Sequence, residues 1–213
     1  MNIALQLTDV RVALGDQRII DGVTAAFAER SLSLVIGRSG AGKSVLWKAV
    51  AGLLPRSGGD VVVNAKPLVF VHQDPALFED RSTLENLTFF ALSRGGERVA
   101  TMARLKELTD ALELGALLDV PARRLSAAQA RRVALGRALM LRPGVLIVDE
   151  PTTGLDAIDA DDVGAALIRA ANESTLVVIT HHPRTIALLG AHPRCRIWRV
   201  EGGTLRGVSE ATA

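Results

Sequence analysis

Short apolar runs separated by polar turns extend along most of this chain, and they are of two kinds. Near the N-terminus the runs are brief and interrupted, which predicts an antiparallel sheet formed before the main sheet begins. Later runs are almost continuously apolar, as expected for parallel strands buried on both faces. These buried runs are Leu32 to Ile36, Leu68 to Val71, Val145 to Val148 and Leu176 to Thr180. A last pair of runs around Gly202-Gly203 predicts a terminal hairpin.

Two dipeptides are expected to interrupt the N-terminal runs. Thr8-Asp9 separates two β-type stretches, and Asp21-Gly22 is typical of a turn. A third break is expected between residues 55 and 59, where Pro and Gly cluster. The antiparallel part is therefore predicted to consist of several short strands.

Residues 75 to about 138 follow a helical pattern instead. Ser82 to Glu85 has the spacing of a capping box, and Gly95-Gly96 interrupts the helix that follows. Helical spacing then relates Val99, Met102, Leu105, Leu108 and Leu112, and further helices are predicted over Arg131 to Met140 and Asp161 to Ala171. We therefore expect one α/β domain over residues 1–213. Its core comprises residues 1–74, with the antiparallel part, and 139–213, and residues 75–138 form an inserted helical subdomain.

The first buried run leads directly into a glycine-rich loop with the spacing G-x-x-x-x-G-K-S, followed by a predicted helix. This is the P-loop pattern: glycines allow backbone N–H groups to surround phosphates, and the helix N-terminus adds its dipole. A glycine-rich turn that merely happens to carry Lys and Ser is the alternative, and the strand before it and the helix after it argue against that. The predicted phosphate-binding residues are Gly37, Arg38, Ser39, Gly40, Ala41, Gly42, Lys43 and Ser44.

Polar residues stand at the ends of three other buried runs. Ligands of parallel sheets lie at the carboxyl ends of the strands. Asp149 is therefore a candidate magnesium ligand together with Ser44, and Glu150 a candidate general base. Gln73 could orient water and contact the metal, and His181 could face the outermost phosphate. Each of these, taken alone, could equally be an ordinary strand-end polar residue.

A turn of small residues precedes the predicted Arg131 helix, far from the P-loop in the chain. Its residues are Ser126, Ala127, Ala128 and Gln129. A helix N-terminus can bind an anion. If one subunit cannot bring this turn to its own phosphates, a second subunit must supply it. An ordinary alanine-rich helix start is the simpler alternative.

The composition excludes some classes of function but does not indicate a particular reaction. A net charge of +2 gives no strong attraction to nucleic acid, and the single Cys195 fits a reducing compartment. The sequence shows neither a signal peptide nor an apolar run long enough to span a membrane. We expect a cytoplasmic protein whose membrane role, if any, comes through a partner.

Taken together, these motifs resemble the ATP-binding-cassette (ABC) ATPase family over nearly the whole chain. They occur in the family's order: GRSGAGKS, VHQDPALF, LSAAQ, VLIVDE, TTGLD and VITHH. The resemblance implies a P-loop NTPase with a RecA-like parallel core, ATP and Mg²⁺ as cofactors, and a head-to-tail dimer with ATP between subunits. It further implies an integral-membrane permease partner, with the chain peripheral at the cytoplasmic face of the inner membrane. Asp156 would be the dimer-communicating residue, and Gln73 would couple nucleotide state to the permease.

The chain departs from the family's pattern at three places. Ala127 and Ala128 replace two glycines of the usual LSGGQ, and their methyl groups are expected to crowd the partner's nucleotide. Leu14 stands where the family often stacks an aromatic ring on adenine, and His182 where an Asp is common. The alanines affect the expected catalytic rate, and Leu14 affects the expected selectivity for the nucleotide base.

The branch of the family is less sharply indicated. IGRSGAGKSVL and PALFED resemble lipid-transport ATPases, whereas LENLTFF and LSAAQARRVALGRAL resemble a haem-exporter ATPase. We favour lipid transport. A cassette ATPase outside transport, or a degenerate cassette that binds ATP as a switch, are the alternatives from other classes.

Overall fold

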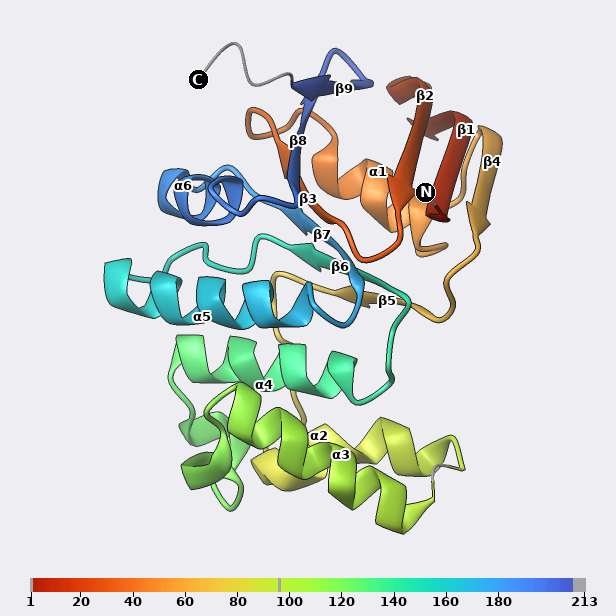
Figure 1. Ribbon diagram of the computed structural model, residues 1–213. Coiled ribbons are helices and arrows are strands. Elements are labelled where there is room, and N and C mark those ends of the chain that lie inside the picture. The colour runs from red at the N-terminus through yellow and green to blue at the C-terminus, as the bar shows by residue number, and fades with distance from the viewer. Residues whose placement is uncertain (1, 96, 209–213) are drawn as a thin grey trace.

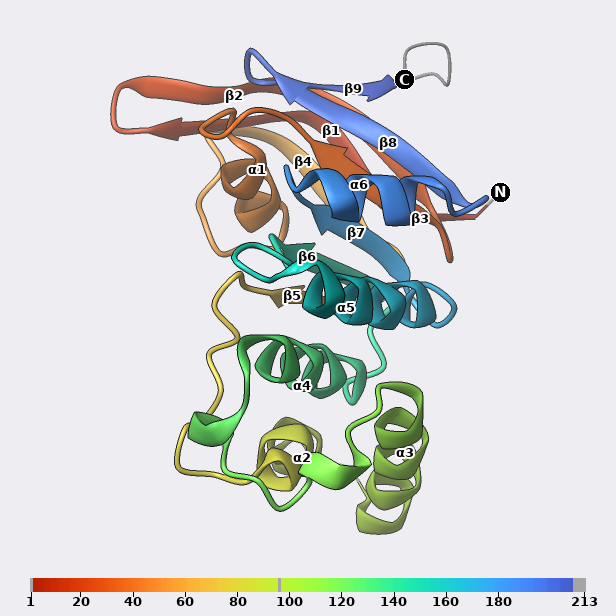
Figure 2. The same cartoon turned by 90° about the vertical axis from the view of Figure 1, so that its left-hand side faces the viewer.

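Two sheets with helices between and below them make up the computed structural model, which describes residues 2–95 and 97–208 (Figure 1). A three-stranded sheet has the order β2-β1-β4, and a six-stranded sheet the order β5-β6-β7-β3-β8-β9. Helix α1 (Lys43–Val50) lies between the two sheets, and the other helices lie on the far side of the six-stranded sheet (Figures 1 and 2).

The three-stranded sheet is antiparallel and formed by long strands. They are β1 (Ile3–Leu14), β2 (Gln17–Ala28) and β4 (Gly58–Val63). The interruptions predicted at Thr8-Asp9 and Asp21-Gly22 are wrong, because both strands continue through them. Asp9 and Gly22 take positive φ angles of 51° and 76°, and the sheet accommodates Asp9 as a register shift. The hairpin turn lies at Gly15-Asp16 instead.

The six-stranded sheet is parallel except at one edge, where β9 (Thr204–Val208) runs antiparallel to β8 (Cys195–Glu201). The other strands are β3 (Leu32–Ile36), β5 (Leu68–Val71), β6 (Val145–Asp149) and β7 (Thr175–Ile179). All four predicted core strands and the terminal hairpin are confirmed. The expected burial of β5 is wrong, because β5 is the edge strand and its residues stay partly exposed.

Alternating side chains of the central strands build two apolar cores. Leu146 and Val148 of β6 point into the core shared with α4 (Ala127–Leu139) and α5 (Ala157–Ala170). Val145 and Ile147 point the other way, into the core shared with α1 and the three-stranded sheet. Both faces are therefore buried, which explains why the four residues from Val145 to Val148 are all apolar.

Three helices and two short 3-10 turns follow β5 and precede β6. They are α2 (Thr83–Ser93), α3 (Arg98–Ala111), η1 (Gly115–Leu117), η2 (Ala122–Arg124) and α4. The predicted capping box at Ser82 is confirmed. The predicted break at Gly95-Gly96 falls partly on residue 96, outside the described residues. The apolar stripe of α3 is only half correct, because Val99 is 74% exposed and Met102 46% exposed.

Two helices begin earlier than the apolar pattern predicted, because polar side chains cap them. Ser126 accepts a hydrogen bond from the Gln129 N–H, so α4 begins at Ala127 rather than near Arg131. Asp156 accepts one from the Asp159 N–H, so α5 begins at Ala157 rather than at Asp161. Helix α6 (Pro183–Gly190) packs on β3 and β8 and completes this face.

A close backbone contact before β6 gives a stability test. A Cβ atom at Gly144 would lie 2.4 Å from the backbone carbonyl of Ala65, so one of the two segments must shift. We expect Gly144→Ala to lower the free energy of unfolding by about 1–3 kcal/mol, the usual cost of overpacking. Urea unfolding measures it. Gly115→Ala, where the new atom meets nothing within 4 Å, is the matched control and should change stability by less than about 0.5 kcal/mol. Equal stability of the two variants would contradict the expected clash.

Candidate functional site

Three neighbouring parallel strands bring the polar segments of the candidate site to one edge of the sheet. In register, Val35 of β3 and Asp149 of β6 both pair with Ile179 of β7. The glycine-rich loop therefore leaves β3 at the same level at which Glu150 leaves β6 and His181 follows β7. This is the carboxyl edge where parallel sheets place their ligands.

The glycine-rich loop fits tightly against the strands around it. Gly37 has a φ of 153°, and a Cβ atom there would lie 2.6 Å from the carbonyl oxygen of Val200 in β8. Gly42 has a φ of 91° and caps the N-terminus of α1, with the side chains of Ile19 and Ile20 close behind it. Both positions thus require glycine for conformation and for space.

Lys43 is the buried cation of this loop. Only 6% of the residue is exposed. Its Nζ donates to the carbonyl oxygens of Gly37 at 2.9 Å and Arg38 at 3.1 Å, so the ammonium group lies inside the curve of the loop. Arg38, Ser39 and Gly40 are exposed at its rim.

Ser44 and Asp149 meet across 105 residues of sequence. The Ser44 hydroxyl donates to Asp149 Oδ1 at 3.0 Å. Burial raises the pKa of the Asp149 carboxyl, and the hydrogen bond from Ser44 opposes that rise. A hydroxyl and a carboxylate side by side form the all-oxygen donor set that Mg²⁺ prefers, so the residues present fit this ion.

Glu150 is held by two side chains. His181 Nδ1 lies 2.7 Å from its Oε1, and Thr153 Oγ1 donates to its Oε2 at 3.1 Å. The Glu150 side chain is 10% exposed, whereas that of His181 is 51% exposed and faces solvent. The structure brings the two predicted residues together, whereas His182, the less favoured histidine, occupies the N-cap position of α6 without a capping hydrogen bond from its side chain.

Gln73 follows the edge strand β5 and is exposed. Within residues 2–95 and 97–208, no hydrogen bond joins its amide to Ser44 or Asp149. It lines a hollow together with Arg131, Pro151 and Val71. The structure therefore places Gln73 near the site's rim but does not bring it to the Ser44–Asp149 pair.

The residues from Ser126 to Gln129 lie at the start of α4, away from the glycine-rich loop. They form a capping box, and no hydrogen bond among the described residues links them to that loop. The two alanines differ: Ala127 is exposed, whereas Ala128 is 1% exposed and packs in the core beneath α4. Leu14, at the end of β1, is 48% exposed.

Thr153 was missed by sequence reasoning. It carries no charge and lies in the turn between β6 and α5, where a threonine looks like a solvated loop residue. Two signals were available: its place in the TTGLD motif, and its position three residues after Glu150, a spacing at which a turn can bring side chains together.

The raised pKa of Asp149 predicts a stability change with a defined sign. A carboxyl with a higher pKa in the folded than in the unfolded chain binds more protons when folded, so stability falls as the pH rises from the unfolded to the folded pKa, and the full cost is present above the folded pKa. Asn cannot ionise and still accepts the Ser44 hydroxyl. We therefore expect Asp149→Asn to raise the free energy of unfolding at pH 7, and the gain to disappear as the pH falls toward the ordinary Asp value of 3.8.

Urea unfolding across this pH range, with EDTA and without nucleotide, measures the change. Asp161→Asn is the control of opposite sign. A hydrogen bond from Arg184 holds the pKa of Asp161 below its usual value, so this change should lower stability at pH 7 and matter less in acid. A loss of stability in Asp149→Asn at pH 7 would contradict the burial penalty.

Comparison with known proteins places this geometry in a family. The family described as ABC transporter matches residues 20–153, more than half of the chain. One relative is the sn-glycerol-3-phosphate import ATP-binding protein UgpC 3 of Rhizobium etli, 34% identical over 72% of this chain and 47% of its own length. A UgpC of Cupriavidus pinatubonensis is 36% identical over 67% of this chain and 42% of its own length. The chain thus spans about half the length of these curated relatives.

Solved structures agree in fold. The CbiO1 protein of Clostridium perfringens, part of the ABC transporter complex CbiONQ, superposes with a TM-score of 0.85 at 22% identity, over 97% of this chain and 88% of that one. A nucleotide-free ATP-binding cassette from an ABC transporter gives 0.81 at 23% identity, over 98% and 92%. The fold is therefore that of a P-loop NTPase cassette. No helix within the described ranges is both long and apolar enough to cross a membrane. The chain belongs to the ATP-binding subunits of the ABC transporter family, a family of ATPases.

Proposed function

We propose that this chain binds ATP with Mg²⁺ and hydrolyses it at a head-to-tail dimer interface to drive transport through a membrane permease. The observation that carries the proposal is the meeting, at one sheet edge, of the buried Lys43 loop, the Ser44–Asp149 pair and the Glu150–His181 pair. These are a phosphate-binding group, a metal-binding group and a proton acceptor, the parts that phosphoryl transfer requires.

Each group has a role in this mechanism. The loop from Gly37 to Ser44 surrounds the phosphates with N–H groups, and Lys43 releases its own carbonyls to bind the outer phosphates. Ser44 and Asp149 would hold Mg²⁺, which neutralises charge on the phosphates when bound, and Gln73 would approach it from the rim. Glu150 accepts the proton of the attacking water, and His181 orients Glu150 and faces the γ-phosphate.

A second copy supplies the remaining contacts. Because Ser126 to Gln129 lie away from their own phosphate loop, they would contact nucleotide held by another subunit, with Asp156 near the same interface. Leu14 would give adenine an aliphatic surface in place of an aromatic ring, so base selectivity should be weak.

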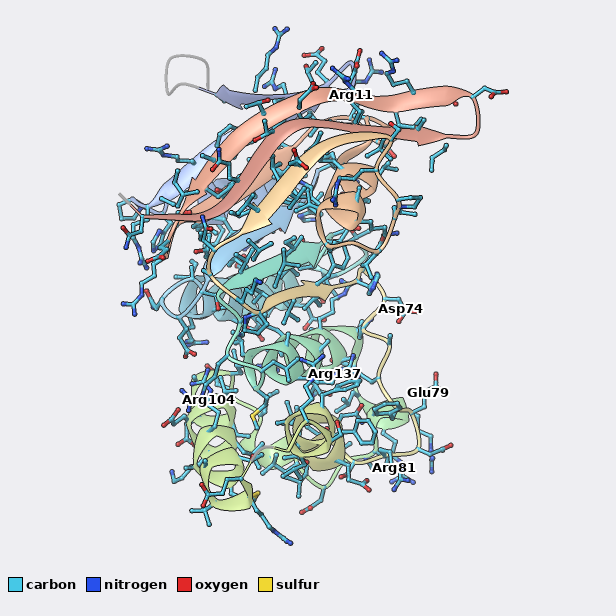
Figure 3. All side chains as sticks on the ribbon, turned by 90° about the vertical axis from the view of Figure 1, so that its right-hand side faces the viewer. Arg11, Asp74, Glu79, Arg81, Arg104 and Arg137 are labelled. Atoms are coloured by element: carbon cyan, nitrogen blue, oxygen red, sulfur yellow. The ribbon has the colours of Figure 1, made fainter. Side chains whose placement is uncertain are left out.

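The segment after Gln73 is the proposed contact with the permease. Figure 3 shows Arg137 of α4 close to this segment, with Glu79 and Arg81 farther along it at the molecular edge. Arg137 donates to the carbonyls of Pro75 at 2.8 Å and Ala76 at 3.0 Å and lies over the Phe90 ring. Beside them, the ring of Phe78 packs edge-on against Phe89, and both remain exposed. An anchored segment with exposed aromatic rings supports a docking surface for a permease, and the chain would act at the cytoplasmic face of the membrane through it.

The relatives reported above bear on the branch of the ABC transporter family, and hence on the class of transported solute. Those reported are named for sn-glycerol-3-phosphate import. They lend no support to the lipid-transport branch, and they favour an importer of a small polar solute over the haem-exporter alternative. The paired Glu150 and His181 argue against a degenerate ATP-binding switch.

Two substitutions separate binding from chemistry. Lys43→Ala should abolish nucleotide binding, measured by titration with a fluorescent ATP analogue, because it removes the buried cation of the loop. Glu150→Gln should keep that affinity within about twofold while hydrolysis falls by roughly 100-fold or more, the contribution of a positioned general base. Lys106→Ala, on the exposed face of α3, is the control and should leave both unchanged. Wild-type hydrolysis by Glu150→Gln would overturn the base assignment.

The two signature alanines should behave differently. Only Ala127 presents its methyl group at the surface, so Ala127→Gly in the Glu150→Gln background should promote ATP-dependent dimerisation in size-exclusion chromatography. Ala128→Gly should not, because its methyl group is buried in its own subunit. It should instead cost about 1 kcal/mol of stability through helix propensity. Equal dimerisation of both variants and their parent would mean that neither alanine hinders assembly.

A further inference from the structure

The carboxylate of Glu150 is held at both oxygens, and the second contact comes from a residue without a role in the mechanism above. His181 reaches Oε1 and the Thr153 hydroxyl donates to Oε2. The backbone at Glu150 has a φ of 47°, a left-handed conformation that is costly for a residue with a side chain. With the backbone in this conformation, the two contacts set the plane of the carboxylate and hence the direction of its free lone pairs.

Thr153 is itself held by a residue of another element, Arg131 of α4. It lies in the turn between β6 and α5, outside any helix or strand. Its own N–H is 3.4 Å from the Glu150 carbonyl, a long hydrogen bond. Its carbonyl accepts a much shorter one, 2.6 Å, from Nη2 of Arg131 in α4. The strongest hydrogen bond on Thr153 therefore comes from another element.

Arg131 is desolvated where it makes this contact. Its Nε and Nη1 atoms are buried and have no hydrogen-bond partner among the described residues. Burial lowers the pKa of this guanidinium. A charge-assisted hydrogen bond in such a site is stronger than the same bond in water. The position of Thr153 is thus tied to the first turns of α4.

We propose that Thr153 is a positioning residue for Glu150, and that Arg131 positions Thr153. The Thr153 hydroxyl keeps its proton and directs the carboxylate toward the attacking water, whose proton passes to Glu150. This inference rests on the proposed role of Glu150 as the base. Because Arg131 follows Ser126 by about one and a half helical turns, engagement of the α4 N-terminus by a second copy reaches the base through Arg131 and then Thr153.

The test compares hydroxyl removal with hydroxyl retention in the purified chain. Thr153→Val has nearly the same shape but cannot donate, and it should lower kcat for ATP about tenfold, part of the roughly 10²–10⁴-fold that a positioned base supplies. KM and the affinity for a fluorescent ATP analogue should stay within about twofold, since no phosphate contact is lost. Thr153→Ser retains the hydroxyl and should restore kcat to within about threefold of wild type. Arg131→Met should lower kcat as Thr153→Val does, and the double variant should be little slower than either alone.

Thr152→Val is the matched control. It removes the neighbouring buried hydroxyl, which contacts Thr185 at 2.5 Å rather than Glu150, and should leave kcat within about twofold. Unchanged kcat in Thr153→Val, a loss that Thr153→Ser does not restore, or a loss equalled by Thr152→Val would each overturn the inference. Glu150→Gln, assayed in parallel, separates the two proposals. If it hydrolyses ATP at the wild-type rate, the base assignment fails; if it is inactive while Thr153→Val is normal, only the positioning role fails.

Discussion

The insertion of β7 between β3 and β6 is the constraint on which the rest of this molecule depends. One residue, Ile179, pairs with Val35 on one side and Asp149 on the other. That register makes the glycine-rich loop, the acidic pair and the histidine leave the sheet at the same level. A slip by one residue would turn every side chain of β7 to the opposite face, and both apolar cores forbid that. Hydrophobic burial on two faces thus sets the geometry of a polar site.

The site itself uses little regular structure beyond these strands. Lys43 is held by carbonyls of its own loop, and Asp149 by a serine from the helix that follows that loop. Glu150 occupies a strained backbone conformation and depends on side chains from two other segments. The sheet therefore fixes one part of the site, whereas turns hold the other part and leave it freer to move, which suits the proposed hydrolysis, in which the site would change state.

Much of this could be predicted from sequence because its signals are local. The apolar runs gave the core strands, and the strand-end rule linked Ser44 with Asp149 although 105 residues separate them. Helix boundaries that depend on a single side chain were harder to predict. Ser126 and Asp156 cap α4 and α5, so both helices begin before their apolar pattern does. Bulges let β1 and β2 continue through residues that usually break strands. The hydrogen bonds of Thr153 and Arg131 leave no trace in periodicity, because they depend on the path of a turn.

The strand order also bears on how this chain folds while it is being synthesised. The three-stranded sheet is complete once residue 63 has been made, and all of its pairings join segments of this first part of the chain. Strand β3 belongs to the same part, yet both of its neighbours, β7 and β8, come from residues 175 to 201. During translation β3 therefore waits with both backbone edges unpaired until most of the chain has been made, and an unpaired strand with apolar side chains invites aggregation and chaperone binding. The glycine-rich loop cannot take its final place against Val200 before that late strand arrives. The loop can therefore bind nucleotide only after residues up to about 201 have been made, and a chain that ends before residue 175 lacks both neighbours of β3.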